Sequence, residues 1–253
     1  MDSANTKYYI VDHQEGFLLE WCRWEYYQMC EYLKTSPSKV IITNSVTFEE
    51  YPEDEFKAEN DKCVQDLKND VQNIYNNKML FVKPPIKDLF SNDRDYITVD
   101  GKNIPMDRIC LLDMKAEKML APEDKQEFDV FLFGGILGDI PSKDKTSILR
   151  KEGFKSRHLG ELQMTTDTAV LCTKLIIEHG KKMEEIPFID EPEFIKMKGK
   201  KYEESTCMEG FRYILDEIDY NTGVITKKDD PKPIGNPNIY ERLVFQDLNQ
   251  DFF

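Results

Sequence analysis

The sequence lacks long apolar runs, a secretory leader and the residue spacings of a metal site. No apolar run approaches the ~18 residues that a membrane-spanning helix needs, so no membrane anchor is expected. Residues Met1–Lys7 are polar and contain no apolar signal core, which predicts a cytoplasmic protein. Only three histidines are present, none at metal spacing, so we expect no metal. The six cysteines include no Cys-x-x-Cys pair, which indicates reduced, buried thiols.

Positive charge is also scarce. The chain has 34 Lys and Arg against 48 Asp and Glu, a net charge of −14. Tight binding of RNA or DNA needs clustered basic residues, so this balance disfavours it and favours a cationic partner. Acidity that only aids solubility fits the charge equally well. One stretch, Lys143–Arg157, has six basic and two acidic residues; a solvated helix face explains it best, with a local nucleic-acid patch as the alternative.

What the sequence does contain is an alternation of strand and helix patterns, typical of an α/β protein with a mainly parallel sheet flanked by helices. The expected strands are Tyr8–Asp12, Lys39–Thr43, Ile109–Leu112, Phe128–Phe133, Ser156–Leu159, Phe188–Asp190 and Phe211–Asp216. The expected helices are Phe17–Lys34, Pro122–Glu127, Lys143–Lys151, Thr165–His179 and one near Asn60–Asn77. From Ile218 onward the chain is polar and proline-rich, which predicts a loosely held tail.

Three segments carry the functional information: Phe128–Asp139, Arg157–Ala169 and Pro187–Phe194. Each couples an apolar strand-like run to a turn, or a turn to a helix start. This spacing suits three neighbouring parallel strands whose carboxyl-end loops meet at one small ligand. In the first segment, glycines follow a buried strand and allow close backbone approach to a ligand, although a tight turn without a ligand explains them equally well. Their spacing does not match the dinucleotide fingerprint.

The second segment leads into a helix through Thr165, Thr166 and Asp167. One of these side chains is expected to cap the helix, and the free amides of the first turn suit a carboxylate of a ligand. Capping alone is the alternative, but it does not explain why two polar turns lead into the same region. In the third segment a carboxylate at Asp190 either takes part in catalysis or accepts backbone hydrogen bonds in a turn, and the turn role is the commoner one.

Taken together, these residues resemble the SPOUT superfamily of methyltransferases. The similarity is greater to the eukaryotic SPOUT family of protein arginine methyltransferases that modify the KH-domain protein of the small ribosomal subunit. It rests on FDVFLFGGILGD at Phe128–Asp139, on QMTTDTA at Gln163–Ala169, and on further motifs. These further motifs are Leu159-Gly160, Phe188-Ile189-Asp190 with Pro192-Glu193-Phe194, Phe211–Asp216, Tyr9–Phe17, Glu20-Trp21 and Glu25-Tyr26.

The resemblance implies a single methyltransferase domain over residues 1–217, with an acidic insertion at 45–101 and a polar tail at 218–253. It also implies a deep C-terminal trefoil knot, a rare exception among folds, and S-adenosylmethionine as cofactor. The residues that would hold the cofactor by this resemblance are Gly134, Gly135, Ile136, Leu137, Gly138, Leu159, Gly160, Gln163, Met164, Thr165, Ala169, Phe188, Ile189 and Asp190.

The family further implies a monomer that methylates a basic ribosomal protein of the small subunit. A guanidinium has a pKa above ~12, so a carboxylate should orient it and accept the proton it loses. We expect Asp139 and Glu161 in that role. Asp12, Glu15 and Glu20 are expected to face the substrate, and the product should be ω-monomethylarginine. An RNA methyltransferase and a non-catalytic protein-binding module are the alternatives.

Overall fold

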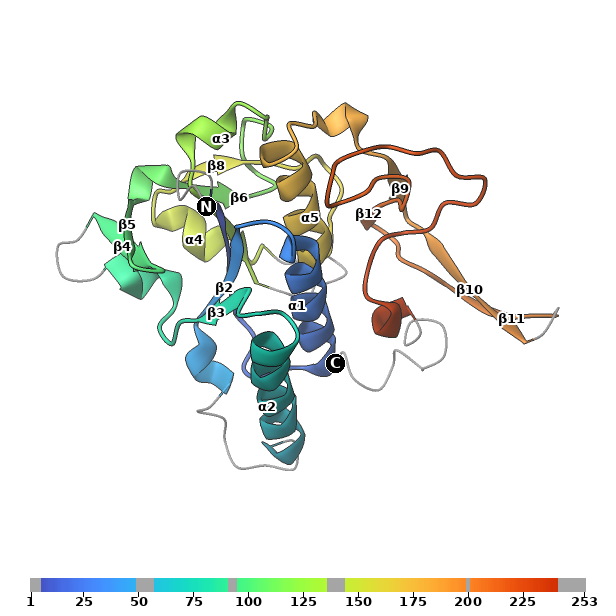
Figure 1. Cartoon of the computed structure of the whole chain (residues 1–253), viewed down its shortest axis with the longest axis horizontal. Coiled ribbons are helices and arrows are strands. Elements are labelled where there is room, and N and C mark those ends of the chain that lie inside the picture. Colours follow the sequence, from blue (N-terminus) through green and yellow to red (C-terminus); the bar gives the residue numbers. More distant parts are fainter. Residues whose placement is uncertain (1–5, 49–56, 91–94, 136–143, 199–200, 241–253) are drawn as a thin grey trace.

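A six-stranded parallel sheet forms the centre of the molecule, as the computed structural model in Figure 1 shows. The structure describes residues 6–48, 57–90, 95–135, 144–198 and 201–240. In order across the sheet, the strands are β3 (Met79–Phe81), β2 (Lys39–Thr43), β1 (Tyr8–Asp12), β7 (Val130–Gly134), β6 (Ile109–Leu112) and β8 (Lys155–Arg157). Every neighbouring pair in this sheet is parallel.

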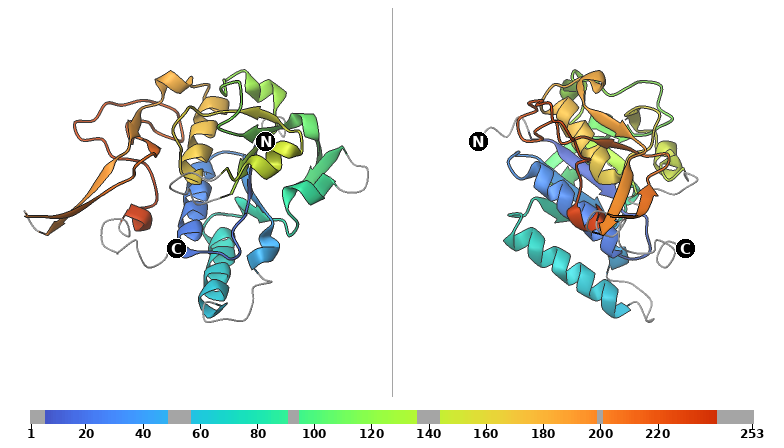
Figure 2. Two further views of the ribbon diagram at one scale, coloured as in Figure 1. Left: turned by 180° about the vertical axis from the view of Figure 1, so that it is seen from behind. Right: turned by 90° about the vertical axis from the view of Figure 1, so that its right-hand side faces the viewer.

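Both faces of the sheet are covered, which explains why its central strands are almost continuously apolar. Side chains alternate along β1, so Tyr9 and Val11 enter one core while Tyr8 and Ile10 enter the other. The first core is closed by the helices α1, α2 and α5, the second by α4, two short strands and a 3₁₀ turn (Figures 1 and 2). The sheet is therefore the middle of three layers.

The helices are α1 (Glu20–Leu33), α2 (Lys57–Asn73), α3 (Asp124–Glu127), α4 (Ser147–Lys151) and α5 (Thr166–Ile177), with 3₁₀ turns η2 (Ser45–Phe48), η3 (Ile86–Phe90), η4 (Met106–Arg108) and η5 (Met183–Glu185). The described part of the chain holds no helix with the length and apolarity that crossing a bilayer requires.

Three antiparallel strand pairs lie outside the central sheet. They are β4 (Tyr96–Val99) with β5 (Lys102–Pro105), β9 (Phe188–Asp190) with β12 (Arg212–Ile214), and β10 (Glu193–Lys198) with β11 (Lys201–Cys207). Figures 1 and 2 show the β10–β11 hairpin pointing away from the rest of the molecule. Neither β4–β5 nor β10–β11 was among the expected strands. The first carries a hairpin signal, because Asp100-Gly101 lies between two strand-like runs, whereas the second is rich in charged residues.

The α/β class and the parallel sheet are confirmed, and four strands have the predicted bounds: β1, β2, β6 and β9. Segment 45–101, expected as an insertion, contributes β3 to the sheet edge and α2 to one covered face. Two expectations were wrong. The strand Phe188–Asp190 does not join the central sheet but pairs antiparallel with β12. The thiol of Cys207 is exposed, because β11 belongs to the hairpin that leaves the core.

The expected loose tail is also wrong for the part that the structure describes. Ile218 and Ile239 are buried, with 2% and 4% of their surface exposed. Leu215 forms a bridge with Pro233, and the amide of Ile234 donates to the carbonyl of Ile214 at 2.7 Å. A few apolar residues spaced along a polar segment are enough to dock it, although its average composition resembles a disordered chain.

A buried lysine fastens this C-terminal segment to the helical layer. Lys174 on α5 has 1% of its surface exposed, and its Nζ donates to the carbonyls of Tyr32 and Tyr220 at 2.6 Å each. Burial lowers the pKa of Lys174, and the two carbonyls compensate the ammonium for part of its lost hydration. The Nζ atom of Lys174 therefore joins α5 to Tyr32 of α1 and to Tyr220 of the C-terminal segment.

We expect Lys174→Met to lower the free energy of unfolding by about 2–4 kcal/mol, because it leaves two buried carbonyl oxygens without their donor. Urea unfolding followed by circular dichroism measures the loss. The matched control is Lys34→Met, since Lys34 is exposed at the end of α1 and pairs there with Glu31, and its change should stay within about 0.5 kcal/mol. Equal losses in the two variants would contradict the role assigned to Lys174.

Candidate functional site

The chain leaves β1 and β7 in opposite directions, and this creates a crevice at their carboxyl ends. From β1 it passes through α1 to β2 on one side, and from β7 through α4 to β8 on the other. Leu149 of α4 enters the second core, whereas α1 packs in the first, so the two helices lie on opposite faces. In open α/β sheets such a switch point is where small ligands bind.

A glycine pair ends β7 at this switch point. The amide of Gly135 donates to the carbonyl of Asp12 at 3.1 Å, which ties the turn to the end of β1. Gly135 has φ +87°, and a Cβ atom there would lie 3.1 Å from Cδ of Lys145 and 3.6 Å from Oε1 of Gln14. Glycine is needed at this position both for its backbone angle and for the close approach of its neighbours.

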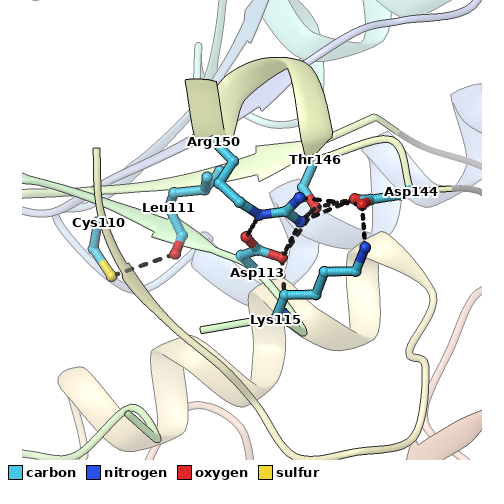
Figure 3. Close-up of polar contacts among 7 residues, drawn as sticks. All are labelled: Cys110, Leu111, Asp113, Lys115, Asp144, Thr146 and Arg150. Atoms are coloured by element: carbon cyan, nitrogen blue, oxygen red, sulfur yellow. Dashed lines mark hydrogen bonds and ion pairs between the residues drawn. The ribbon is translucent and has the colours of Figure 1, made fainter. Parts of the chain in front are cut away.

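An ion-pair network holds the start of α4 against the same turn (Figure 3). The Asp113 carboxylate accepts hydrogen bonds from the Arg150 guanidinium at 2.5 and 2.8 Å and from Oγ1 of Thr146 at 3.1 Å. Asp144 completes the network by pairing with Lys115 and Arg150. Thr146 in turn stands beside Gly134, where a Cβ would come within 2.8 Å of its methyl carbon. The network thus holds Thr146, at the start of α4, beside the glycine pair.

The start of α5 lies against the other side of the turn. Oγ1 of Thr166 donates to the carbonyl of Gly135 at 3.1 Å. The expected cap is not local: Thr165 occupies the N-cap position, but its hydroxyl donates to Thr168 instead of receiving an amide. Oε2 of Glu25, on α1, accepts the amides of Thr166 and Asp167 at 3.1 and 3.3 Å.

Glu25 and Asp167 form a buried pair of acids at this helix start, with 1% and 3% of their surfaces exposed. Burial raises the pKa of Glu25, and the charge of Asp167 raises it further, although hydrogen bonds from Trp21 and the two amides oppose this. Burial also raises the pKa of Asp167. Charged carboxylates are costly in such a position unless donors or cations compensate them.

The second and third sequence segments meet through Arg212 of β12. Its amide donates to the carbonyl of Gln163 at 2.8 Å, and its guanidinium pairs with the Asp190 carboxylate at 2.6 and 2.9 Å. The guanidinium also lies over the Phe188 ring, 4.9 Å from its centroid. A Cβ at Gly160, which has φ +104°, would lie 3.7 Å from the same guanidinium. Arg212 had not been singled out from the sequence.

The structure places the predicted cofactor residues in several different surroundings. The glycine pair contacts the α5 start, and the turn at Gly160 contacts β9 through Arg212. Four residues are half-buried and pack against the first core: Leu159, Met164, Ala169 and Phe188. Ile189 lies within β9. Four further residues lie outside the described part of the chain: Ile136, Leu137, Gly138 and the expected catalytic Asp139.

The other expected acids occupy different surroundings. Glu161 is exposed on the loop after β8. Asp12 is 6% exposed, and its Oδ1 accepts the Thr43 hydroxyl at 2.6 Å and the Ile86 amide at 2.9 Å. This geometry does not support the expected place of Asp12 in a substrate-facing patch.

Glu15 and Glu20 lie nearer the surface, and each has a basic neighbour. Glu15 pairs with Lys145 at 2.8 Å, and Glu20 with Arg23 at 3.1 Å. Glu15 is the nearer to the crevice, because Lys145 also borders Gly135.

The basic stretch Lys143–Arg157 is largely neutralised by the chain itself. Lys145 pairs with Glu15, Arg150 with Asp113 and Asp144, Lys155 with Glu127, and Arg157 with Asp124. Phosphates would have to compete with these carboxylates for the same cations. The nucleic-acid patch that the composition left open therefore finds no support in the described residues.

Comparison with known proteins shows which family the chain belongs to. The family model described as "Protein arginine N-methyltransferase SFM1-like" matches residues 8–227. The chain belongs to this family. Protein arginine N-methyltransferase SFM1 of Saccharomyces cerevisiae is 36% identical over 215 residues, which cover 83% of this chain and 86% of the yeast protein.

Crystal structures of yeast arginine methyltransferase SFM1 resemble the fold as well. The complex with SAM superposes with a TM-score of 0.65 at 31% identity, covering 94% of this chain and 90% of the yeast chain. The complex with SAH gives a TM-score of 0.62 at 30% identity, covering 94% of both chains. The SFM1-like family thus accounts for most of the described structure.

We expect Asp113→Asn to lower the free energy of unfolding at pH 7 by about 1–3 kcal/mol, because it removes charge-assisted hydrogen bonds from a buried side chain. Burial alone would raise the pKa of Asp113, but hydrogen bonds from Arg150 and its other donors outweigh this and lower it. The stabilisation is therefore complete above about pH 4 and is lost as pH falls through the lowered pKa.

Urea unfolding at pH 7 and at pH 3 tests this expectation. The difference in free energy of unfolding between wild type and variant should be smaller at pH 3. Asp230→Asn is the control, because Asp230 forms an exposed pair with Lys232 and its change should stay within about 0.5 kcal/mol. A loss for Asp113→Asn that is the same at both pH values would refute the ionic origin.

Proposed function

We propose that this protein transfers a methyl group from S-adenosylmethionine to a guanidinium nitrogen of an arginine in a basic ribosomal protein of the small subunit, giving ω-monomethylarginine. Membership of the SFM1-like family makes the chain a protein arginine N-methyltransferase. The observation that carries the proposal is the contact of the glycine pair with the α5 start, at the switch point of a chain that matches this family from residue 8 to 227.

The residues at the crevice fit the cofactor. Yeast SFM1 has been crystallised with SAM and with SAH. In this chain the positive-φ glycines 135 and 160 place no side chain at their turns, and half-buried Leu159, Met164 and Phe188 offer apolar surface for an adenine ring. We propose that these turns, with Thr165 and Asp190, hold the cofactor.

The chain's own residues must align the arginine and remove a proton. When bound, S-adenosylmethionine supplies an electrophilic sulfonium methyl group and leaves as S-adenosylhomocysteine. The guanidinium loses one N–H proton as its new N–C bond forms, and a carboxylate within hydrogen-bond reach accepts that proton. A carboxylate also orients the planar guanidinium through two parallel hydrogen bonds, which brings the nucleophilic nitrogen into line. We propose Asp139 and Glu161 for this work, with Glu15 and Glu20 on the substrate side.

The charge of the chain supports a basic substrate. A net charge of −14 attracts a cationic protein and repels the phosphates of RNA. Four of the basic residues in the most basic stretch are already paired with carboxylates. We also propose that the enzyme is a cytoplasmic monomer, that residues 1–217 form one knotted SPOUT methyltransferase domain with an insertion at 45–101, and that residues 218–253 follow it as an appended segment.

The direct test is to incubate the protein with methyl-labelled S-adenosylmethionine and a ribosomal extract. Label should enter a basic protein of the small subunit, and acid hydrolysis should release ω-monomethylarginine. Label that enters RNA would favour the RNA methyltransferase, and absence of S-adenosylhomocysteine binding in calorimetry would favour the non-catalytic binding module.

We expect Asp139→Asn to keep its affinity for S-adenosylhomocysteine in calorimetry but to lose turnover in the labelling assay by roughly 100-fold or more. Near-normal turnover would show that Asp139 is not the carboxylate that accepts the proton.

We expect Gly135→Val to abolish binding of S-adenosylhomocysteine in calorimetry, because the side chain would fill the crevice beside Lys145 and Gln14. Gly153→Val is the matched control, since Gly153 has φ +84° but nothing within 4 Å of a Cβ. Both variants should lose about 1 kcal/mol or more of folding stability from backbone strain. Unchanged cofactor affinity in folded Gly135→Val would contradict the pocket assignment.

A further inference from the structure

The buried carboxylates of Glu25 and Asp167 have no cation opposite them. Glu25 receives Nε1 of Trp21 at 2.7 Å and two amides, and Asp167 receives the hydroxyl of Tyr32 at 3.4 Å. Within the described residues neither acid forms an ion pair. Oε1 of Glu25 receives a single donor and so keeps a free acceptor site. A buried carboxylate either keeps a proton, as the raised pKa of Glu25 indicates, or is compensated by a cation, and a bound cation would displace that proton.

A buried hydroxyl without a partner stands beside the same acids. Tyr213 of β12 is 2% exposed, and its hydroxyl has no hydrogen-bond partner within the described part of the chain. β12, which carries Tyr213, contacts α5, which carries Asp167. Burial raises the pKa of Tyr213, and the negative charges of Asp167 and Glu25 raise it further. An unsatisfied buried hydroxyl costs folding free energy, so a ligand that pairs with it accounts for its retention.

Aromatic rings enclose this group. The ring of Tyr213 lies 6.3 Å from Phe194 in an edge-on arrangement, and Phe194 stacks on Tyr240 at 4.8 Å. Trp21 is part of the same small apolar cluster. Flat aromatic faces beside carboxylates suit a guanidinium better than an ammonium, because the guanidinium is planar, stacks on rings and binds a carboxylate through two donors.

The cluster adjoins the cofactor turn through one residue. Thr166 donates its amide to Glu25 and its hydroxyl to the carbonyl of Gly135. A group bound at Glu25 would therefore lie next to the turn at which we place the cofactor.

We infer that Glu25, Asp167 and Tyr213 form the pocket that receives the guanidinium of the substrate arginine. This inference rests on the proposed function and identifies where its substrate is held. The carboxylates supply the opposite charge and the acceptors, Tyr213 fixes the plane of the group, and the rings stack on its faces. These three residues accordingly bind and orient the arginine, while the methyl donor occupies the neighbouring turns.

The C-terminal segment 235–240 covers this pocket and must move to admit the arginine. Beyond Ile234 it is held by the Asn236 side chain, which donates to the carbonyl of Trp24 at 3.2 Å, and by the rings of Tyr240 and Phe194. Ile239 packs on Trp21 with 4% of its surface exposed. With these contacts in place, Glu25, Asp167 and Tyr213 are buried from solvent.

Two variants test the pocket by separate routes. Glu25→Gln removes the ability to carry a negative charge but retains an oxygen that can accept the α5 amides. Tyr213→Phe removes a hydroxyl that makes no hydrogen bond among the described residues. Each should raise KM for acid-extracted small-subunit ribosomal proteins about 10- to 100-fold, with S-adenosylhomocysteine affinity unchanged in calorimetry. Glu178→Gln, at the far end of α5, and Tyr8→Phe, on the other face of the sheet, are the controls and should leave KM unchanged.

A small probe gives a readout that needs no turnover. Ethylguanidinium at millimolar concentration, added with S-adenosylhomocysteine, should raise Tm of the wild type more than ethylammonium does, and both variants should lose the difference. Variants that fold and keep wild-type KM and the ethylguanidinium response would overturn the pocket. A wild type that binds no S-adenosylhomocysteine and labels no protein would instead refute the proposed function, so the two failures are distinguishable.

Discussion

The carboxylate of Glu25, buried between two helices, is the interaction on which the site depends. It takes the place of a local cap by accepting the first amides of α5 from across the helix interface. Through Thr166 the start of α5 is then fixed against the carbonyl of Gly135. The helical layer and the glycine turn are therefore held in register by one side chain, and the same side chain carries the charge that we assign to substrate binding.

The surface electrostatics follow from where the basic residues are used. Basic residues are fewer than acidic ones, and several are paired within the chain. Lys174 donates to two carbonyls, Arg150 pairs with Asp113, and Arg212 pairs with Asp190. Each of these contacts joins segments that are distant in sequence. The negative charge that remains is available to a basic protein, whereas an RNA backbone would meet mostly carboxylates.

The sequence predicted the class of fold because the central strands are covered on both faces and read as short apolar runs. It could not predict the place of β9, since a short strand carries no information about which edge it joins. The sequence predicted the helix start at Thr165 but not its cap, because the capping residue Glu25 lies 141 residues from Thr166 in the chain. The motif at Glu25-Tyr26 had been noted as a family feature, yet only the fold brings it beside Asp167 and Tyr213.

The position of β1 has a consequence for how the chain is made. Tyr8 pairs with Lys39 on one side but with Val130 on the other. As the polypeptide emerges from the ribosome, β1 finds β2 early and then keeps an apolar edge open until β7 has been synthesised. An open edge of this kind pairs readily with strands of other chains. The open edge therefore makes the nascent N-terminal half prone to aggregation. The pairing of β1 with β7, which covers this edge, is distant in sequence and therefore slows folding.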